Sequence, residues 1–313
     1  MDTPRRKYPI GACTFEGPIE ERYYKVAGQT FALRMEAGDP LWDAMGNYAP
    51  FRTDARQEPL LFALDAMPSD PLQGDHLLLE GDSYDEGMPR LDIYSVPAGL
   101  RIRMAPTQSA AVCASLDVVP GYTRGSLNFL RRGAKFSLDN SLMLMYAFSS
   151  ARKGTLEMHA SVVADSDGAY MFLGESGAGK STHSRMWLEG IPGTVLVNDD
   201  NPIVRVGPDG AVMVCGSPWS GKTPCYKNME MPLKAAVSIK KAPRNALKPL
   251  DIFESYSLVY SSCSGFRSDP ALADGMHENI ERFLQAVPCY ELECLPDTDA
   301  ARTCRKEIKK HSI

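Results

Sequence analysis

The sequence predicts an α/β protein of the α+β type with two domains that differ in their patterns. Residues 1–135 contain short strand-like runs separated by loops rich in Pro, Gly and Asp, which is typical of a β-rich domain. Residues 136–313 begin with an amphipathic helix pattern and continue with alternating strand and helix patterns. We therefore expect a smaller β-rich N-terminal domain and a second domain with a mixed, largely antiparallel sheet.

The N-terminal domain is predicted to consist mainly of strands. The runs 24–26 and 31–35 alternate in polarity around Ala27-Gly28, which predicts a hairpin. Further strands are expected at 59–64, 90–94, 100–104 and 110–119. Because the region carries no catalytic signature, it could hold an acceptor substrate or only brace the second domain, and the sequence leaves both open.

The second domain opens with a helix predicted over 136–152, which Ser137 can cap and which ends before Gly154. Strands are expected at 157–164 and 169–173, and the turn 165–168 is so short that they must pair antiparallel. The segment 255–269 is polar and is expected to be a loop. The later patterns predict strands at 193–200, 203–206, 211–215, 232–239 and 289–292, and helices at 181–188, 270–287 and 297–309.

The clearest motif of the chain lies between the strand 169–173 and the helix that follows it. Gly174-Glu-Ser-Gly-Ala-Gly-Lys-Ser181 fits the phosphate-loop pattern G-x-x-x-x-G-K-[ST] at every fixed position, in the strand–helix context that the motif requires. The glycines let backbone N–H groups approach a polyphosphate at the positive end of a helix. The motif predicts a nucleotide-phosphate site, with ATP and Mg²⁺ as its cofactors.

Each residue of this loop has an expected role. Lys180 would reach the β- and γ-phosphates, and the Ser181 hydroxyl would bind Mg²⁺. The residues expected to bind the nucleotide are Gly174, Glu175, Ser176, Gly177, Ala178, Gly179, Lys180, Ser181 and Thr182.

Two adjacent carboxylates, Asp199 and Asp200, end the predicted strand 193–200. An acid that acts on Mg²⁺ or on the nucleophile belongs at the carboxyl end of a buried strand near the phosphates. The alternative is that both residues only form the turn before Pro202, because Asp is common in turns.

Composition and charge restrict the partners. The formal net charge is −5 and the pI is about 5.6, which argues against nucleic acid as a partner. No apolar run approaches the roughly 18 residues of a membrane span, and residues 1–7 are not followed by the apolar run of a signal peptide. The eight cysteines are scattered without a C-x-x-C pair, which favours reduced thiols in a cytoplasmic protein.

Three motifs in order carry a resemblance to a known family. His159-Ala-Ser-Val-Val, then Phe172 to Ser181, then Val197-Asn-Asp-Asp200 resemble the bacterial HPr kinase/phosphorylase family, in particular the HPr-kinase-like proteins. These share a nucleotide fold with ATP-dependent phosphoenolpyruvate carboxykinases, in which the phosphate loop joins antiparallel strands. The resemblance covers about residues 136–308.

The resemblance implies roles for the acidic pair and for one histidine. Asp199 would be the base that accepts the proton of the acceptor hydroxyl, and Asp200 would hold Mg²⁺ together with Ser181. His159 matches a histidine that lies close to the catalytic aspartate, although a packed strand histidine is the alternative. HPr kinases form closed oligomers, so a homo-oligomer is one alternative for this chain.

The chain also departs from the HPr kinases. They carry Glu where this chain has Thr182, and their Arg-Gly-x-Gly-Ile signature is absent downstream. The resemblance therefore does not imply HPr as the substrate, nor phosphorolysis.

The expected reaction is transfer of the γ-phosphate of ATP to a hydroxyl of a protein, a peptide or a small metabolite. Lys180, Mg²⁺ and one further cation would neutralise the charge, and Lys222 and Arg205 are the candidates for that cation. The alternatives are a plain ATPase, a carboxykinase-like transfer, and a non-catalytic nucleotide-sensing module.

Overall fold

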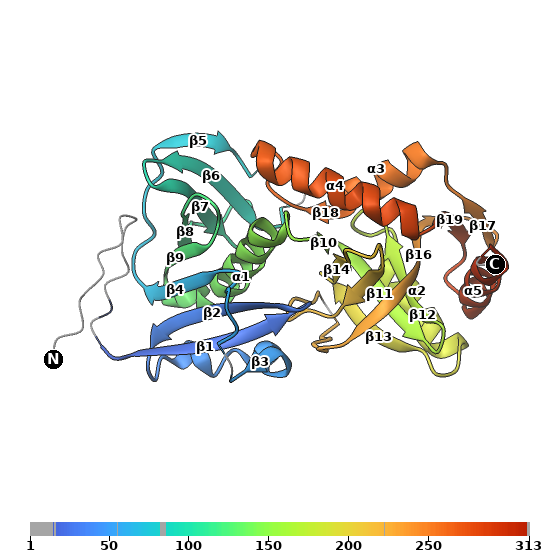
Figure 1. The fold of residues 1–313 in the computed structure, drawn as a ribbon, viewed down its shortest axis with the longest axis horizontal. Coiled ribbons are helices and arrows are strands. Elements are labelled where there is room, and N and C mark those ends of the chain that lie inside the picture. Colours follow the sequence, from blue (N-terminus) through green and yellow to red (C-terminus); the bar gives the residue numbers. More distant parts are fainter. Residues whose placement is uncertain (1–14, 16, 55, 82–85, 222, 312–313) are drawn as a thin grey trace. The chain divides into compact units, whose positions relative to one another are not determined.

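The computed structural model describes residues 15, 17–54, 56–81, 86–221 and 223–311 (Figure 1). The chain divides into two compact units, residues 1–149 and 150–313. The boundary expected from the sequence, after residue 135, falls in the first turn of the helix α1 (Ala134–Ser150), whereas the units divide at the C-terminal end of this helix. Contacts of α1 hold it in unit 1, since Tyr146 Oη donates to Val26 O (3.0 Å) and Ser149 Oγ donates to Tyr122 O (2.6 Å).

Unit 1 is a mixed sheet on which the helix α1 packs. The strand order is β3-β1-β2-β4-β9-β8-β7-β6-β5, and the β2–β4 and β4–β9 pairs are parallel while the others are antiparallel. Its strands are β1 (Ile19–Val26), β2 (Gln29–Glu36), β3 (Arg52–Thr53), β4 (Ala63–Pro68), β5 (His76–Leu79), β6 (Arg90–Val96), β7 (Gly99–Ala105), β8 (Ala114–Val118) and β9 (Arg124–Phe129). Short 3₁₀ turns occupy Pro40–Trp42, Gly46–Phe51 and Arg131–Gly133.

The β-rich character predicted for unit 1 is confirmed, but the start of one strand was predicted wrongly and one strand was missed. The hairpin around Ala27-Gly28 forms as β1–β2. The strand expected at 59–64 begins later, at Ala63, and β9 was not predicted. The β9 sequence RGSLNF lacks apolar alternation, yet residues 125–129 are buried because β9 is a central strand between β4 and β8. Tertiary packing therefore overrides its local pattern.

Replacing Gly99 with Ala is expected to destabilise unit 1 by about 3 kcal/mol. Gly99 has φ +140°, and an added Cβ would lie 2.1 Å from the carbonyl oxygen of Val118. Gly38 is a matched control, because its φ is also positive (+77°) but its Cβ would meet no atom within 4 Å. Urea unfolding of both variants separates backbone strain from the clash, and equal losses would show that the clash contributes nothing.

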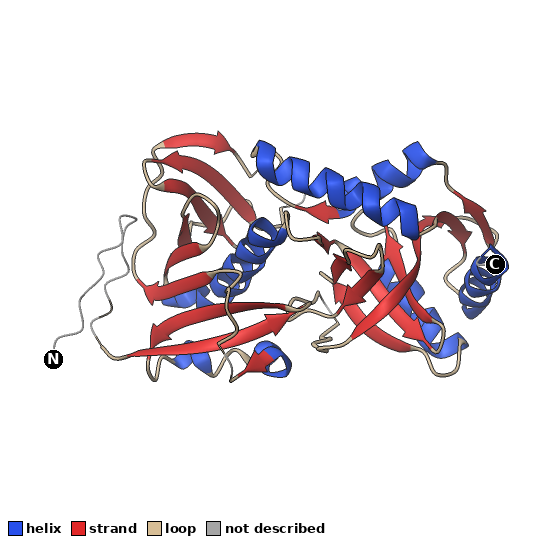
Figure 2. Ribbon diagram, viewed as in Figure 1, coloured by secondary structure: helices blue, strands red, loops and turns tan. Residues whose placement is uncertain are grey.

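Unit 2 is built on a second mixed sheet, with helices on both faces (Figure 2). The strand order is β13-β11-β12-β16-β15-β14-β10-β18, and β19 pairs with β16 and β17. Its strands are β10 (Thr155–Met158), β11 (Ala160–Asp165), β12 (Gly168–Leu173), β13 (Val195–Asp200), β14 (Ile203–Val206), β15 (Val212–Cys215), β16 (Glu230–Lys241), β17 (Ala246–Pro249), β18 (Cys263–Ser264) and β19 (Cys289–Cys294). Its helices are α2 (Lys180–Gly190), α3 (Ile252–Ser262), α4 (Pro270–Ala286) and α5 (Thr298–His311).

Strand β12 shows how the two faces of this sheet are covered. Met171 and Leu173 point into a core shared with α3 and α4, whereas Tyr170 and Phe172 point into a core shared with α2 and α5. Alternation along a strand places neighbouring side chains on opposite faces, so β12 is buried on both. Burial on both faces explains why the run Tyr170–Leu173 reads as continuously apolar and aromatic.

Two sequence expectations for unit 2 are wrong. The strand expected over 157–164 divides at His159 into β10, which pairs with β14 and β18, and β11, which pairs with β12 and β13. The segment 255–269, expected to be a loop, contains most of α3. A capping box starts this helix, since Asp251 and Glu254 each accept a hydrogen bond from the backbone N–H of the other.

Within the described part of the chain, each helix is too short or too polar to pass through a membrane.

Candidate functional site

The glycine-rich loop, residues 174–179, connects the carboxyl end of β12 to α2, as the motif predicts. Gly174, Gly177 and Gly179 have φ values of +134°, +80° and +111°, a region that only glycine adopts without strain. The N–H of Ala178 donates to Glu175 O (3.1 Å), and that of His183 donates to Gly179 O (2.8 Å) as α2 begins. The loop therefore ends at the positive pole of a helix, which favours an anion there.

The side chain of Lys180 lies inside this loop. Its Nζ donates to the carbonyl oxygens of Gly174 (2.8 Å) and Glu175 (3.2 Å), and the residue is only 9% exposed. Burial lowers the pKa of Lys180, while the carboxylates of Asp200 and Asp199 act in the opposite direction. The ammonium group is thus enclosed by the loop and close enough to both aspartates for their charges to act on it.

Asp199 and Asp200 lie at the same edge of the sheet as the loop. β11 lies between β12 and β13 and is antiparallel to both, so β12 and β13 run in the same direction and their carboxyl ends lie at the same edge of the sheet. Ser161 pairs with Phe172 on one side and with Asp199 on the other, which separates their strands by about 10 Å.

The Asp199 side chain projects toward α2. Residues paired across an antiparallel ladder project to the same face of a sheet. Ser161, the partner of Asp199, lies 2.6 Å from Ser184 of α2, measured between their Oγ atoms. Asp199 Oδ1 is buried and has no hydrogen-bond partner among the described residues. A buried carboxylate oxygen left unpaired in this way is typical of a functional position.

A buried amide holds the backbone of the acidic pair. Asn198 donates from Nδ2 to Ser217 Oγ (3.1 Å) and Trp219 O (3.0 Å), and its Oδ1 accepts from the N–H of Asn201 (2.9 Å). The N–H of Gly221 donates to Asp199 O (2.9 Å). These bonds restrain the turn after β13, so the two carboxylates are presented from a rigid backbone.

His159 occupies the break between β10 and β11, where its N–H donates to Ser262 O (2.7 Å). Its Nδ1 lies 3.2 Å from Asp200 Oδ1, and Asp200 Oδ2 accepts from Asn201 Nδ2 (2.9 Å). The structure thus brings His159 to the acidic pair, at Asp200 rather than at Asp199. Its catalytic role stays a prediction.

Glu157, two residues before His159, is a buried acid that the sequence reading did not single out. It is 2% exposed, and neither carboxyl oxygen reaches a partner in hydrogen-bonding geometry within the described residues. Burial raises the pKa of Glu157 to about 8; the nearby Ser264 hydroxyl lowers it, and the charge of Asp200 raises it further. The Glu157 carboxyl is therefore mostly protonated at pH 7, next to the His159–Asp200 pair.

Of the two candidates for an additional cation, the structure describes Arg205, and its contacts lie away from the site. Arg205 lies on β14, where its Nη2 contacts Glu230 Oε2 (2.7 Å), and none of its described contacts reaches the loop or the acidic pair. Lys222 lies outside the described residues. A role for either residue in phosphoryl transfer stays a prediction.

A cavity of about 490 Å³ lies beside the glycine-rich loop. β12, β16 and β19 are adjacent and parallel, so their carboxyl ends meet at this edge, which is where open α/β sheets bind ligands. The lining residues come from the loop, from α2 and from the ends of β16 and β19: Ala178, Gly179, Thr182, His183, Ile239, Lys241, Ala242, Cys294, Leu295 and Pro296.

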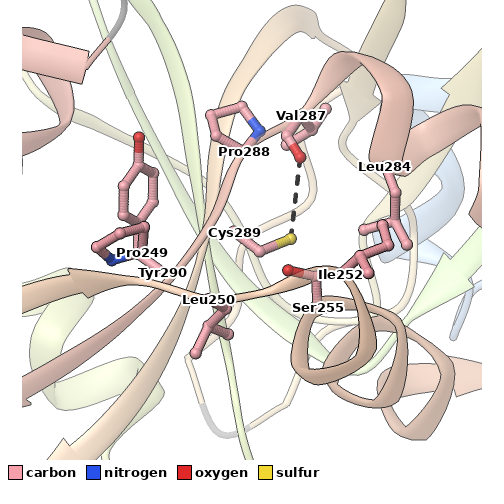
Figure 3. A pocket seen from close by; sticks show the side chains of 9 residues that line it. All are labelled: Pro249, Leu250, Ile252, Ser255, Leu284, Val287, Pro288, Cys289 and Tyr290. Carbon is pink, nitrogen blue, oxygen red and sulfur yellow. Dashed lines mark hydrogen bonds between the residues drawn. The ribbon is translucent and has the colours of Figure 1, made fainter.

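A second cavity, of about 280 Å³, lies where α3, the end of α4 and the start of β19 meet (Figure 3). The Cys289 thiol faces it, within 3.9 Å of Val287 O. Burial raises the pKa of Cys289 to about 11, so the thiol is protonated at neutral pH and is a poor nucleophile. No described lining residue is charged. This cavity therefore offers no group for the expected chemistry.

The oxygen donors near the loop fit Mg²⁺. This ion usually takes one or two carboxylates together with phosphate and water oxygens, rather than a cage made only by protein. Asp200 supplies a carboxylate at the end of β13, and Ser181 a hydroxyl on the first turn of α2. Within the described residues no group of three or more His, Cys, Asp or Glu side chains is arranged to hold a metal ion. An ion shared with a bound polyphosphate needs no such group.

Three residues of the site escaped the sequence reading. Glu157 carried a detectable signal, since it is an acid within an apolar strand, where an unpaired charge is costly. His183 and Asn198 carried none, because only the folded chain places the first at the cavity and the second beneath the acidic pair.

Comparison with known proteins adds no assignment. No family model matches the chain, and no curated protein is significantly similar to it.

Proposed function

We propose that unit 2 binds ATP and transfers its γ-phosphate to a hydroxyl group of a protein, a peptide or a small metabolite. The observation that carries the proposal is the convergence of three features at one edge of the sheet. These are the glycine-rich loop, the enclosed Lys180, and the Asp199–Asp200 pair whose charges act on that lysine.

Each residue of the site has a separate role in the proposed transfer. The loop N–H groups and the start of α2 hold the phosphates, and Lys180 exchanges its carbonyl partners for phosphate oxygens. Asp199, which has an unpaired buried oxygen, accepts the proton of the attacking hydroxyl. Ser181 and Asp200 would hold Mg²⁺, which supplies charge neutralisation on the β- and γ-phosphates. His159 orients Asp200 through their 3.2 Å contact.

The seven described cysteines are free, which supports placing this reaction in the cytoplasm, where thiols stay reduced.

The test is transfer of radioactive γ-phosphate from ATP, with Mg²⁺, to panels of Ser/Thr peptides and hydroxylated metabolites. Label on a hydroxyl supports the proposal. Phosphate release alone would indicate an ATPase, label in phosphoenolpyruvate a carboxykinase-like transfer, and binding without turnover a nucleotide sensor.

Lys180→Met is expected to weaken binding of a non-hydrolysable ATP analogue at least about tenfold, because it removes a charge-assisted contact to the phosphates. Lys306→Met is the matched control, since Lys306 is exposed on α5. Isothermal titration of both variants measures the effect. Equal affinities for the analogue in Lys180→Met and in the wild type would refute the assignment of Lys180.

A further inference from the structure

The cavity beside the glycine-rich loop has apolar walls and few polar side chains. Ile239, Leu295 and Pro296 supply apolar surface, and the polar side chains are those of Thr182, His183 and Lys241, besides the Cys294 thiol. None of the described lining residues carries a carboxylate or an amide side chain. Its volume of about 490 Å³ falls within the range of small-molecule sites.

His183 is held rigidly at this cavity. It is 3% exposed, its ring stands edge-to-face with Phe172 (4.6 Å between centroids), and Trp187 one turn later donates from Nε1 to His183 Nε2 (3.0 Å). Among the described residues, this is the one hydrogen bond that the ring makes.

The Trp187 contact determines the tautomer of His183. An indole N–H can only donate, so His183 Nε2 must be the acceptor, and the proton of the neutral ring lies on Nδ1. A ring nitrogen that accepts a hydrogen bond carries no proton, so the His183 ring is neutral while this contact is present. His183 thus presents one N–H donor, on Nδ1, that the described residues leave unused.

We propose that this cavity binds the adenine base of the nucleotide and that His183 Nδ1–H, held in that tautomer by Trp187, donates a hydrogen bond to a ring nitrogen of the base. The proposal rests on the proposed function, because it assumes that the loop binds the triphosphate of the same molecule. Thr182 follows the phosphate-binding residues directly, so a base attached to those phosphates lies within reach of the cavity.

The chemistry of the lining favours adenine over guanine. Adenine offers ring nitrogens that accept hydrogen bonds, which matches a histidine that can only donate from Nδ1. Adenine carries N–H donors only on its N6 amino group, whereas guanine carries them on ring N1 and on N2, so guanine would bury more donors without a carboxylate or amide side chain to accept them. A site that leaves buried polar groups unpaired rejects the ligand that brings them.

The test compares three probes on the full chain by isothermal titration with Mg²⁺. These are the β,γ-imido analogues of ATP and GTP, and inorganic tripolyphosphate. We expect the ATP analogue to bind at least about tenfold tighter than the GTP analogue, and tripolyphosphate to bind detectably. Equal affinities for the two analogues would overturn the base assignment and leave the proposed function standing. If none of the three probes binds, both the base assignment and the proposed function are wrong.

His183→Phe removes the donor and keeps an aromatic ring of similar size. We expect this substitution to weaken binding of the ATP analogue about tenfold and to leave binding of tripolyphosphate unchanged. His277→Phe is the matched control, because His277 lies on α4 and does not line the cavity. An equal loss of affinity for both probes would show that His183 only supports the loop. Unchanged affinity for both probes would show that His183 does not contact the base.

A measurement on the wild-type protein does not depend on the folding of the variant. Nitrogen-15 NMR of labelled histidines should show the His183 ring protonated on Nδ1 at pH 7, and its Nδ1 resonance should shift with the ATP analogue but not with tripolyphosphate. Trp187→Phe removes the donor to His183 Nε2, so the ring should no longer be protonated only on Nδ1. A His183 ring protonated on Nε2, or a His183 Nδ1 resonance that the ATP analogue does not shift, would refute the assignment.

Discussion

Asp199→Asn is expected to lower phosphoryl transfer about 10²–10⁴-fold while binding of the ATP analogue stays close to that of the wild type. Asn keeps the size of the side chain and its hydrogen-bonding capacity, but it cannot accept the proton of an attacking hydroxyl. The backbone of this position is restrained by Gly221 and by the neighbouring Asn198, so the substitution should not displace the turn. Single-turnover transfer with radioactive ATP measures the step directly.

Two further variants make this result specific. Asp209→Asn is the matched control, since Asp209 lies exposed in the turn between β14 and β15. Asp200→Asn should instead raise the Mg²⁺ concentration needed for transfer, because Asp200 is assigned to the ion. Unchanged transfer in Asp199→Asn would eliminate the base assignment. Loss of nucleotide binding together with transfer would show that Asp199 acts in binding.

Glu157→Gln is expected to remove a pH dependence of stability from unit 2. Burial raises the pKa of Glu157 from the ordinary 4.5 to about 8, so between these values the folded state holds a proton that the unfolded state releases. Stability therefore falls as the pH rises through this window, by about 1.4 kcal/mol per pH unit. Gln stays uncharged, so the stability of the variant relative to the wild type should increase by roughly 4 kcal/mol between pH 5 and pH 8.

The measurement is urea unfolding at several pH values in the presence of a chelator, with amide hydrogen exchange of β11 and β12 to follow unit 2. The quantity to compare is the change with pH, because a buried amide has its own unpaired groups and shifts the stability at every pH. Glu189→Gln is the control, since its side chain on α2 is 55% exposed. A difference between Glu157→Gln and the wild type that does not change with pH would mean that Glu157 is charged in the folded protein.

Local sequence patterns were sufficient for most of the secondary structure. The G-x-x-x-x-G-K-[ST] pattern placed a loop between β12 and α2, and the short turn at 165–168 required β11 and β12 to be antiparallel. The acidic pair was correctly expected at the end of a strand. These predictions succeeded because turn chemistry and apolar periodicity act over a few neighbouring residues.

The secondary-structure predictions that failed are mostly those in which residues far along the chain determine the local structure. The break at His159 was invisible in the apolar run 157–164, because it arises when the chain leaves the β14 ladder and joins the β12 ladder. Strand β9 forms from a sequence without alternation because its neighbours bury it. Helix α3 was predictable from its capping box, a signal that the polar composition of 255–269 concealed.

The sequence by itself determined the loop, the acidic pair and the existence of two units, because each depends on a motif or on a change of local pattern. Only the tertiary structure decided that β11 aligns Asp199 with Phe172, that burial raises the pKa of Glu157, and that Trp187 holds His183 at a cavity. Strand register and burial depend on partners far along the chain. The charge of a buried acid and the tautomer of a buried histidine depend on those partners in turn.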